Sequence, residues 1–177
     1  SVVWMPWIRC WQASCEPNPL HIVLYATSYI GATATFPFPT PESKRIEVYY
    51  ALAAGAKGLS YWYFNPGNPS NGIGAGTPDA LALWREIALL GAEVRTAGPL
   101  LVTSCPATLT TQSSSGLWVR PLMAGRDTLM LLVVNDNYYN DATSCHYTNL
   151  NNATVTATLP SWLPSPTAFE ISAAGIS

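Results

Sequence analysis

The chain has 177 residues, a length that suits one ordinary domain or two small ones. Apolar residues make up 49% of it and charged residues 10%, and 8 Lys and Arg against 10 Asp and Glu give a net charge of −2. This composition excludes a disordered chain, which would lack apolar material to bury, and it offers no basic surface for nucleic acid. No apolar stretch in the sequence is long enough to predict insertion into a membrane.

A strand followed by a helix is predicted in the first third of the chain. The near-continuous apolar run 20–25 predicts a strand covered on both faces, as in a parallel sheet. A helix is predicted to begin at Thr40 and Pro41, because Thr is a good N-cap and Pro suits the first helical position. Lys44 lies off the apolar face of this helix, and Gly55 is a natural stop. Apolar residues recur at helical spacing on that face: Ile46, Tyr49, Tyr50, Ala53 and Ala54.

The same order of elements is then repeated. The run 58–64 predicts a second buried strand with aromatic residues, and a loop rich in Gly, Pro and Asn follows it. Thr77 and Pro78 repeat the helix-start signal, and Gly98 and Pro99 are predicted to end the helix. Strand, helix, strand and helix in this order predict an α/β fold with parallel strands.

The sequence pattern changes near residue 98, where helical periodicity gives way to the alternation typical of strands. We therefore divide the chain into two predicted domains, 1–98 and 99–177. In the second, turn-forming residues separate short strands, a pattern that predicts a small antiparallel β-sandwich. The predicted strands cover residues 117–120, 128–134, 153–159 and 168–171.

The run 39–62 reads PTPESKRIEVYYALAAGAKGLSYW and resembles the last βα units of (β/α)8-barrel glycoside hydrolases. In those enzymes a helix with a similar end feeds the eighth strand, which ends in aromatic residues and precedes a last helix and often an all-β domain. The resemblance implies that 1–98 is the C-terminal part of a TIM barrel, incomplete in this chain, and that a β-sandwich follows. A full barrel needs about 250 residues, so its remaining strands are expected from the same protein or from another chain. A small open α/β sheet, complete in itself, is the alternative.

Candidate ligand-binding residues lie at the ends of the two predicted strands. In the enzymes that the chain resembles, an aromatic residue at the end of the eighth strand forms a floor under a sugar ring, since flat rings pack against the CH faces of sugars. The resemblance makes Trp62 the first candidate, with Phe64 on the same face and Asn65 as a polar partner. Tyr29, past the first strand, is a further candidate. The alternative is that Trp62 is a core residue.

The acidic residues have structural explanations. Glu42 and Asp79 lie beside predicted helix N-termini, where a negative charge is favourable. Residues 20–30, the presumed seventh strand and its tip, contain no carboxylate. Glycoside hydrolysis usually needs two carboxyl groups, so either these lie outside this segment or the barrel has lost catalysis. The other helical acids are predicted on solvated faces: Glu47, Glu86 and Glu93.

The sequence predicts neither a cofactor nor a metal. It contains no phosphate-binding loop and no dinucleotide fingerprint. A calcium ion is a weak alternative in the loop that holds Asn135, Asp136, Asn137 and Asp141, because these ligands have no recognised spacing.

The even count of four cysteines fits an oxidising compartment, and we expect an extracellular or cell-surface location. The spacing favours one disulfide between Cys10 and Cys15 and another between Cys105 and Cys145, while the other pairings and four free thiols remain alternatives. Asn152 begins the sequon Asn-Ala-Thr, which is glycosylated only where the source modifies such sites.

These observations favour part of a secreted glycoside hydrolase-like protein that acts on a polysaccharide or oligosaccharide. The alternative is a non-catalytic carbohydrate-binding or structural extracellular protein with a degenerate barrel, whose low charge would suit assembly with copies of itself. A separate α/β domain of other function is the third possibility. The expected ligand is carbohydrate, with no nucleic acid and no membrane insertion.

Overall fold

The structure is a computed structural model that describes residues 4–30, 35–65, 72–140, 145–163, 166–172 and 175–176. Its helices are α1 (Trp4–Cys15), α2 (Pro41–Ala53) and α3 (Pro78–Thr103). Its strands are β1 (His21–Tyr25), β2 (Tyr29–Ile30), β3 (Thr35–Phe36), β4 (Gly58–Trp62), β5 (Ser104–Pro106), β6 (Thr111–Ser113), β7 (Leu117–Ala124), β8 (Thr128–Asn135), β9 (Tyr138–Asn140), β10 (Cys145–Tyr147), β11 (Val155–Ala157), β12 (Ile171–Ser172) and β13 (Gly175–Ile176).

Both ends of α2 follow the predicted local signals. The Thr40 hydroxyl accepts a hydrogen bond from the backbone N–H of Ser43 at 3.2 Å, which confirms the N-cap. At the other end Gly55 has a φ of 96°, a conformation that glycine adopts without steric penalty. Its N–H bonds to the Leu52 carbonyl at 2.9 Å, and the N–H of Ala56 bonds to the Ala51 carbonyl at 3.1 Å. This pair of bonds is a Schellman motif, which satisfies carbonyls that the helix leaves free.

Helix α3 begins as predicted and ends later than predicted. Thr77 caps it by accepting from the N–H of Ala80 at 3.3 Å. The helix then continues through Pro99 to Thr103, although a proline lacks an N–H donor and disfavours a helix interior. Leu101, beyond the proline, is buried in the core cluster. Tertiary packing of this last turn therefore outweighs the local stop signal.

The β1–β4 pair is parallel, as predicted, but it is covered on one face only. Its register pairs Ile22 with Leu59 and Leu24 with Tyr61 on the inner face. Burial alternates along β1, with Ile22 and Leu24 buried and the three residues between and beside them exposed. The prediction of a strand covered on both faces is therefore wrong, because helices pack against only one side.

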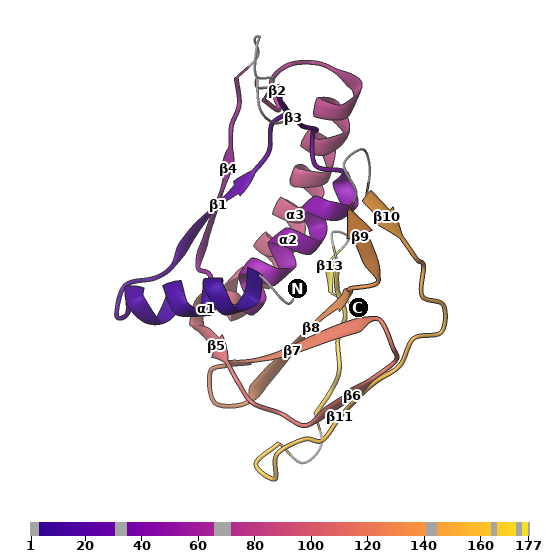
Figure 1. Cartoon of the computed structure of the whole chain (residues 1–177). Helices are drawn as coiled ribbons and strands as arrows, with labels where there is room; N and C mark the ends of the chain where they lie inside the picture. The colour runs from indigo at the N-terminus through magenta and orange to yellow at the C-terminus, as the bar shows by residue number, and fades with distance from the viewer. Residues whose placement is uncertain are drawn as a thin grey trace.

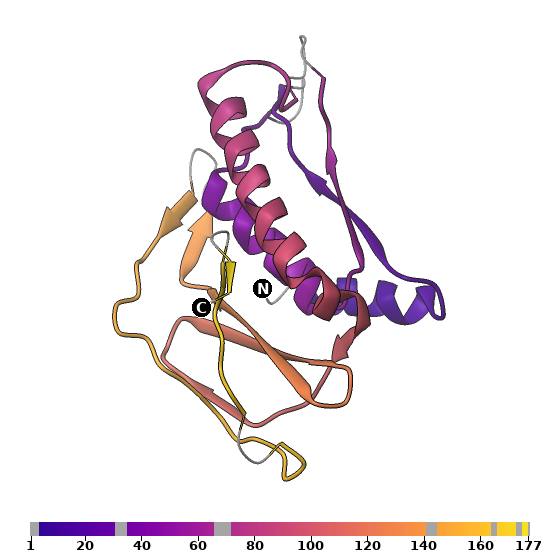
Figure 2. The ribbon, with the colours of Figure 1, turned by 180° about the vertical axis from the view of Figure 1, so that it is seen from behind.

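Helices α2 and α3 form the middle layer of the molecule. Figure 1 shows them crossing its centre, with the β1–β4 pair on one side and β7 and β8 on the other; α3 lies behind α2 in this view and in front of it in Figure 2, which is seen from behind. Strands β5, β7 and β8 form a three-stranded antiparallel sheet. The other described strands beside β1–β4 form two-stranded pairs: β2–β3, β6–β11, β9–β10 and β12–β13.

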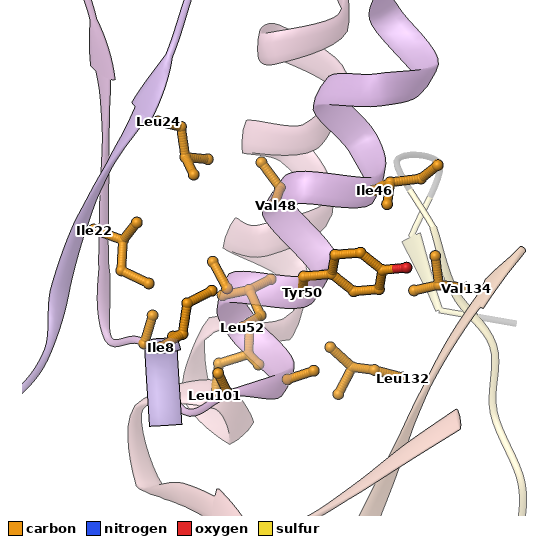
Figure 3. Close-up of a cluster of buried hydrophobic side chains, with 14 of the residues drawn as sticks. Ile8, Ile22, Leu24, Ile46, Val48, Tyr50, Leu52, Leu101, Leu132 and Val134 are labelled. Atoms are coloured by element: carbon orange, nitrogen blue, oxygen red, sulfur yellow. The ribbon is translucent and has the colours of Figure 1, made fainter. Parts of the chain in front are cut away.

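One large apolar cluster joins these layers. Figure 3 shows side chains from β1, α2, α3 and β8 converging around α2, and Ile8 of α1 lies among them. Tyr50, in the middle, packs edge-on against Trp118 with ring centroids 4.9 Å apart. Its hydroxyl donates a hydrogen bond to Asp136. The core therefore continues from the first predicted domain into the second.

The predicted barrel fold is corrected by this arrangement. In the described parts of the chain the parallel sheet consists of β1 and β4 alone, and no strand extends it on either edge. The helices on one side of this pair pack against an antiparallel sheet instead of completing a ring. The local helix and strand signals that suggested a TIM barrel are present, but two strands cannot close a cylinder.

The predicted β-sandwich is corrected as well. A sandwich needs two sheets whose inner faces pack together. Here the sheet of β5, β7 and β8 packs against α2 and α3, and the remaining described strands are short pairs. The alternating pattern predicted β7 and β8 and overlaps β11, but most of the predicted strand 168–171 is not a strand, and the helices supply the opposing layer. The division into 1–98 and 99–177 stays a prediction, although α3 and the core cluster both cross it.

Candidate functional site

Aromatic side chains gather where the two parallel strands end. Tyr25 is the last residue of β1 and Trp62 the last residue of β4, and the two are register partners on the uncovered face. Trp62 is 61% exposed, which rules out the alternative that it is a core residue. Tyr61, the residue before it, packs against the core instead. The strand alternation thus turns Trp62 outward.

The short β2–β3 ribbon adds two more rings beside Tyr25. Tyr29 and Phe36 are partners across this ribbon, and both are exposed. The Phe36 ring meets the Tyr25 ring edge-on, with centroids 6.4 Å apart, and the Trp62 and Tyr63 rings lie 5.2 Å apart. We call these five residues, Tyr25, Tyr29, Phe36, Trp62 and Tyr63, the aromatic platform.

The segment after β4 is held by a returning stretch of backbone. The N–H of Gly72 bonds to the Asn65 carbonyl at 2.9 Å, and the N–H of Ile73 bonds to the Tyr63 carbonyl at 3.1 Å. The side-chain amide of Asn65 donates to the Tyr63 hydroxyl at 3.2 Å. These bonds fix Tyr63 next to Trp62, and they place Asn65 at the edge of the platform.

The structure separates Phe64 from the platform. Its ring meets that of Trp84 on α3, with centroids 6.2 Å apart, and both side chains are exposed. Of the predicted ligand-binding residues, Trp62 and Tyr29 therefore belong to the platform, Asn65 supports it, and Phe64 belongs to a second aromatic pair. The sequence did not identify Tyr25, Phe36 and Tyr63 as site residues, because the platform depends on the partly uncovered sheet.

A buried charge lies directly behind the platform. The Lys44 side chain is 0% exposed, and its ammonium group donates to the Tyr25 carbonyl and to the carboxylate of Glu47. Burial lowers the pKa of Lys44, although the charge of Glu47 and its hydrogen bond act in the opposite direction. Burial likewise raises the pKa of Glu47 although Lys44 opposes this. Lys44 is thus a positioning residue that holds the end of β1.

A second ion-pair network ties the two central helices together. Arg45 donates to Glu86 at 2.7 Å and to Glu93 at 2.8 Å, and the Tyr49 hydroxyl donates to Glu93 at 2.8 Å. Burial, followed by the hydrogen bond to Glu93, raises the pKa of Tyr49 to about 12. The prediction that Glu93 faces solvent is wrong, since its side chain is buried between α2 and α3.

The cysteines differ from the predicted disulfide pattern. Cys10, Cys15 and Cys105 are free thiols, so neither favoured bridge is formed. Cys10 and Cys15 both lie on α1, where a rise of about 1.5 Å per residue separates them by roughly 7.5 Å along the axis, more than the roughly 7 Å that a disulfide spans between Cα atoms. The side chain of Cys145 lies outside the described residues. Asn152 of the sequon is exposed, and its glycosylation stays a prediction.

The loop considered for calcium is already bonded internally. Asp136 accepts a hydrogen bond from Tyr50, and Asn135 uses its amide to donate to the Thr148 carbonyl at 2.9 Å. The N–H of Asn137 bonds to the side-chain oxygen of Asn135 at 3.0 Å, and Asp141 lies outside the described residues. In the part of the chain that the structure describes, no three His, Cys, Asp or Glu side chains are grouped as metal ligands.

Comparisons with family models, with curated proteins and with solved structures found no match, so no relative supports the predicted resemblance to glycoside hydrolases. None of the described helices combines the length and apolar character that crossing a membrane requires. The chemistry of the site therefore has to be derived from the platform itself. It offers several exposed aromatic faces, tyrosine hydroxyls and no charged side chain.

Proposed function

We propose that this chain binds carbohydrate through the aromatic platform. The observation that supports this proposal is the pairing of Trp62 with Tyr25 on the uncovered face of a parallel strand pair, with further exposed rings on both sides. Soluble proteins seldom leave a group of large apolar side chains exposed unless the group binds something.

Sugars have the surface that such a platform fits. The CH faces of a pyranose ring pack on flat aromatic rings and bury apolar area, while the sugar hydroxyls remain free to form hydrogen bonds. The tyrosine hydroxyls of the platform and the amide of Asn65 are polar groups beside the rings. An uncharged site of this kind suits a neutral ligand better than a phosphate or an acidic one.

We propose that the platform binds carbohydrate and does not hydrolyse it. Breaking a glycosidic bond needs two carboxyl groups that face each other across it, whereas the platform consists of aromatic residues. Glu47, behind it, already forms an ion pair with Lys44. A location outside the cell is part of the same proposal, and it is supported by the exposed asparagine of the sequon, Asn152.

Trp62→Ala tests the proposal directly. A sugar ring stacked on Trp62 removes apolar area from water at about 25 cal/mol per Å², so losing a contact of roughly 60 Å² costs about 1.5 kcal/mol. We therefore expect the variant to bind about tenfold more weakly. Binding is measured by co-sedimentation with insoluble neutral polysaccharides, such as cellulose and chitin, and by calorimetry with their soluble oligosaccharides. Trp162→Ala is the matched control, because Trp162 is an exposed tryptophan outside the platform.

Two results would contradict the proposal. One is that the unmodified chain binds none of the polysaccharides on a broad glycan panel. The other is that Trp62→Ala and Trp162→Ala bind equally well. Circular dichroism spectra of both variants establish that each is folded.

A further inference from the structure

We infer that the ligand is a linear, neutral oligosaccharide of three or more rings that lies along the uncovered face of β1 and β4. This inference rests on the proposed function and extends it from a platform to an elongated site. It depends on three features of this face: the platform, a polar pair and a groove beside α1.

The uncovered face continues from the platform toward the start of both strands. Below Tyr25 it carries Val23 and His21 of β1, and Val23 is 59% exposed. Below Trp62 it carries Ser60 and Gly58 of β4. None of these side chains carries a carboxylate, an ammonium or a guanidinium group, so the face suits an uncharged ligand.

A polar pair lies on this face below the platform, with Ser60 two positions before Trp62 and His21 four positions before Tyr25. His21 and Ser60 share a hydrogen bond of 2.7 Å between the ring Nε2 and the hydroxyl oxygen. Gly58 makes this geometry possible, because a Cβ at that position would lie 2.5 Å from Nδ1 of His21. A hydroxyl can donate one hydrogen bond and accept others, so the pair keeps capacity for sugar hydroxyls.

A groove of about 320 Å³ borders the face at His21 and Val23. It runs between α1 and β1, and its lining includes Trp11, Ser14, Cys15, His21 and Val23. Trp11 is exposed, and its ring lies 6.4 Å from that of Trp7. A second stacking surface thus stands at the opposite end from Trp62.

The length of the face sets the length of the ligand. His21 lies four positions before Tyr25, which at about 3.3 Å per residue is roughly 13 Å. A pyranose ring with its linking oxygen, built from bonds of about 1.5 Å, covers roughly 5 Å. The distance from the platform to His21 thus accommodates more than two rings, and Trp11 lies farther along.

The test is a calorimetric titration with two series of neutral oligosaccharides, from β-1,4-glucose and from β-1,4-N-acetylglucosamine, each of one to six rings. For the series that binds, the affinity of the unmodified chain should rise with each added ring up to three or more. Ser60→Ala and His21→Ala should each weaken binding of the longer members about fivefold, the effect of one hydrogen bond. They should leave the monosaccharide unaffected, and Trp62→Ala should weaken every length.

Gly58→Ala provides an independent variant, because the added methyl group displaces the His21 ring. We expect it to reproduce the His21→Ala pattern, while Gly91→Ala, an open position on α3, serves as the matched control. Circular dichroism and light scattering accompany each titration.

The outcomes separate the inference from the proposed function. Affinity that does not depend on length, or a Ser60→Ala variant that binds long oligosaccharides normally while Trp62→Ala is weakened, overturns the elongated site and leaves the platform. Failure of every oligosaccharide to bind overturns both. A stable dimer that Val23→Glu dissociates would show that a second copy covers this face, and that result also overturns the inference.

Discussion

Lys44 is a charged side chain in a fully buried position on α2. Isolated charges are not tolerated there, since removing an ammonium group from water is expensive unless it is paired. Lys44 meets this requirement with two oxygens, the Tyr25 carbonyl and the Glu47 carboxylate. Its position on the sequence, off the apolar face of the helix, gave no indication of burial, because the packing of β1 over it is a tertiary feature.

Lys44→Ala should destabilise the protein strongly. The substitution leaves a cavity, an unpaired Tyr25 carbonyl and an unpaired Glu47, and breaking a buried pair costs 3–5 kcal/mol in typical cases. Since Glu47 remains 41% exposed, we expect the lower end, about 3 kcal/mol, in urea denaturation. The double variant Lys44→Met and Glu47→Leu should lie within about 1 kcal/mol of the parent. Equal instability of both variants would contradict this account.

The raised pKa of Tyr49 predicts how the free energy of unfolding changes at alkaline pH. Its pKa is raised from 10.0 to about 12 in the folded chain, so the folded state holds the phenol proton more tightly than the unfolded state does. The contribution of this proton to the free energy of unfolding is fully present below pH 10, and it is lost as the pH rises from 10 to about 12. Urea denaturation between pH 8 and 12 should show this decline.

Tyr49→Phe is the control for that measurement. Burial also raises the pKa of Tyr25 and of Tyr61, so the variant should lessen the decline without abolishing it. A Tyr49→Phe variant that loses stability as steeply as the parent would show that Tyr49 does not contribute.

At the scale of elements, the two helices of the middle layer begin with the same cap in different surroundings. Thr40 and Thr77 each accept a hydrogen bond from the backbone three residues later. Thr40 has a further bond of 2.6 Å to the hydroxyl of Tyr147 on β10, which also lies 2.9 Å from the Ser43 hydroxyl. The cap of α2 therefore also joins this helix to the β9–β10 hairpin.

The two caps form a matched pair of substitutions. Thr77→Ala should lower the free energy of unfolding by about 1 kcal/mol, the usual effect of losing an N-cap. Thr40→Ala should lower it by about 2 kcal/mol, because it also removes a tertiary hydrogen bond. A double-mutant cycle with Tyr147→Phe measures the difference, and equal losses at both caps would show that the bond to Tyr147 contributes nothing.

At the scale of the whole molecule, the helical layer contacts elements of both predicted domains. Leu122 of β7 is 0% exposed and belongs to the same cluster as Ile22 of β1 and Leu52 of α2. Apolar area buried in one shared cluster couples the elements that line it, because loss of packing in one exposes the others. The boundary predicted near residue 98 falls inside α3, the element that both parts contact.

Leu122→Ala tests this coupling. Removing a buried leucine side chain typically costs 2–5 kcal/mol, and we expect a single unfolding transition shifted to lower urea concentration. Hydrogen exchange measured by mass spectrometry should show lower protection in β1 and α2 as well as in β7 and β8. Protection that falls only after residue 98 would indicate two independent domains.

The sequence by itself determined the local features of this protein. The caps at Thr40 and Thr77 and the stop at Gly55 appear where they were predicted. The same holds for the two parallel strands, although the second was predicted to be buried and ends in the exposed Trp62. These features depend on residues within one or two turns of each other, whose preferences are encoded in the residue types themselves.

Only the tertiary structure decided which faces are covered. It left one side of the β1–β4 pair uncovered, buried Lys44 and Glu93, continued α3 past Pro99 and replaced the predicted barrel and sandwich by sheets on either side of two helices. The aromatic platform exists for the same reason. Whether a face is buried depends on which elements pack against it. The whole chain decides this, because the favourable removal of apolar area from water depends on how all the elements cover one another.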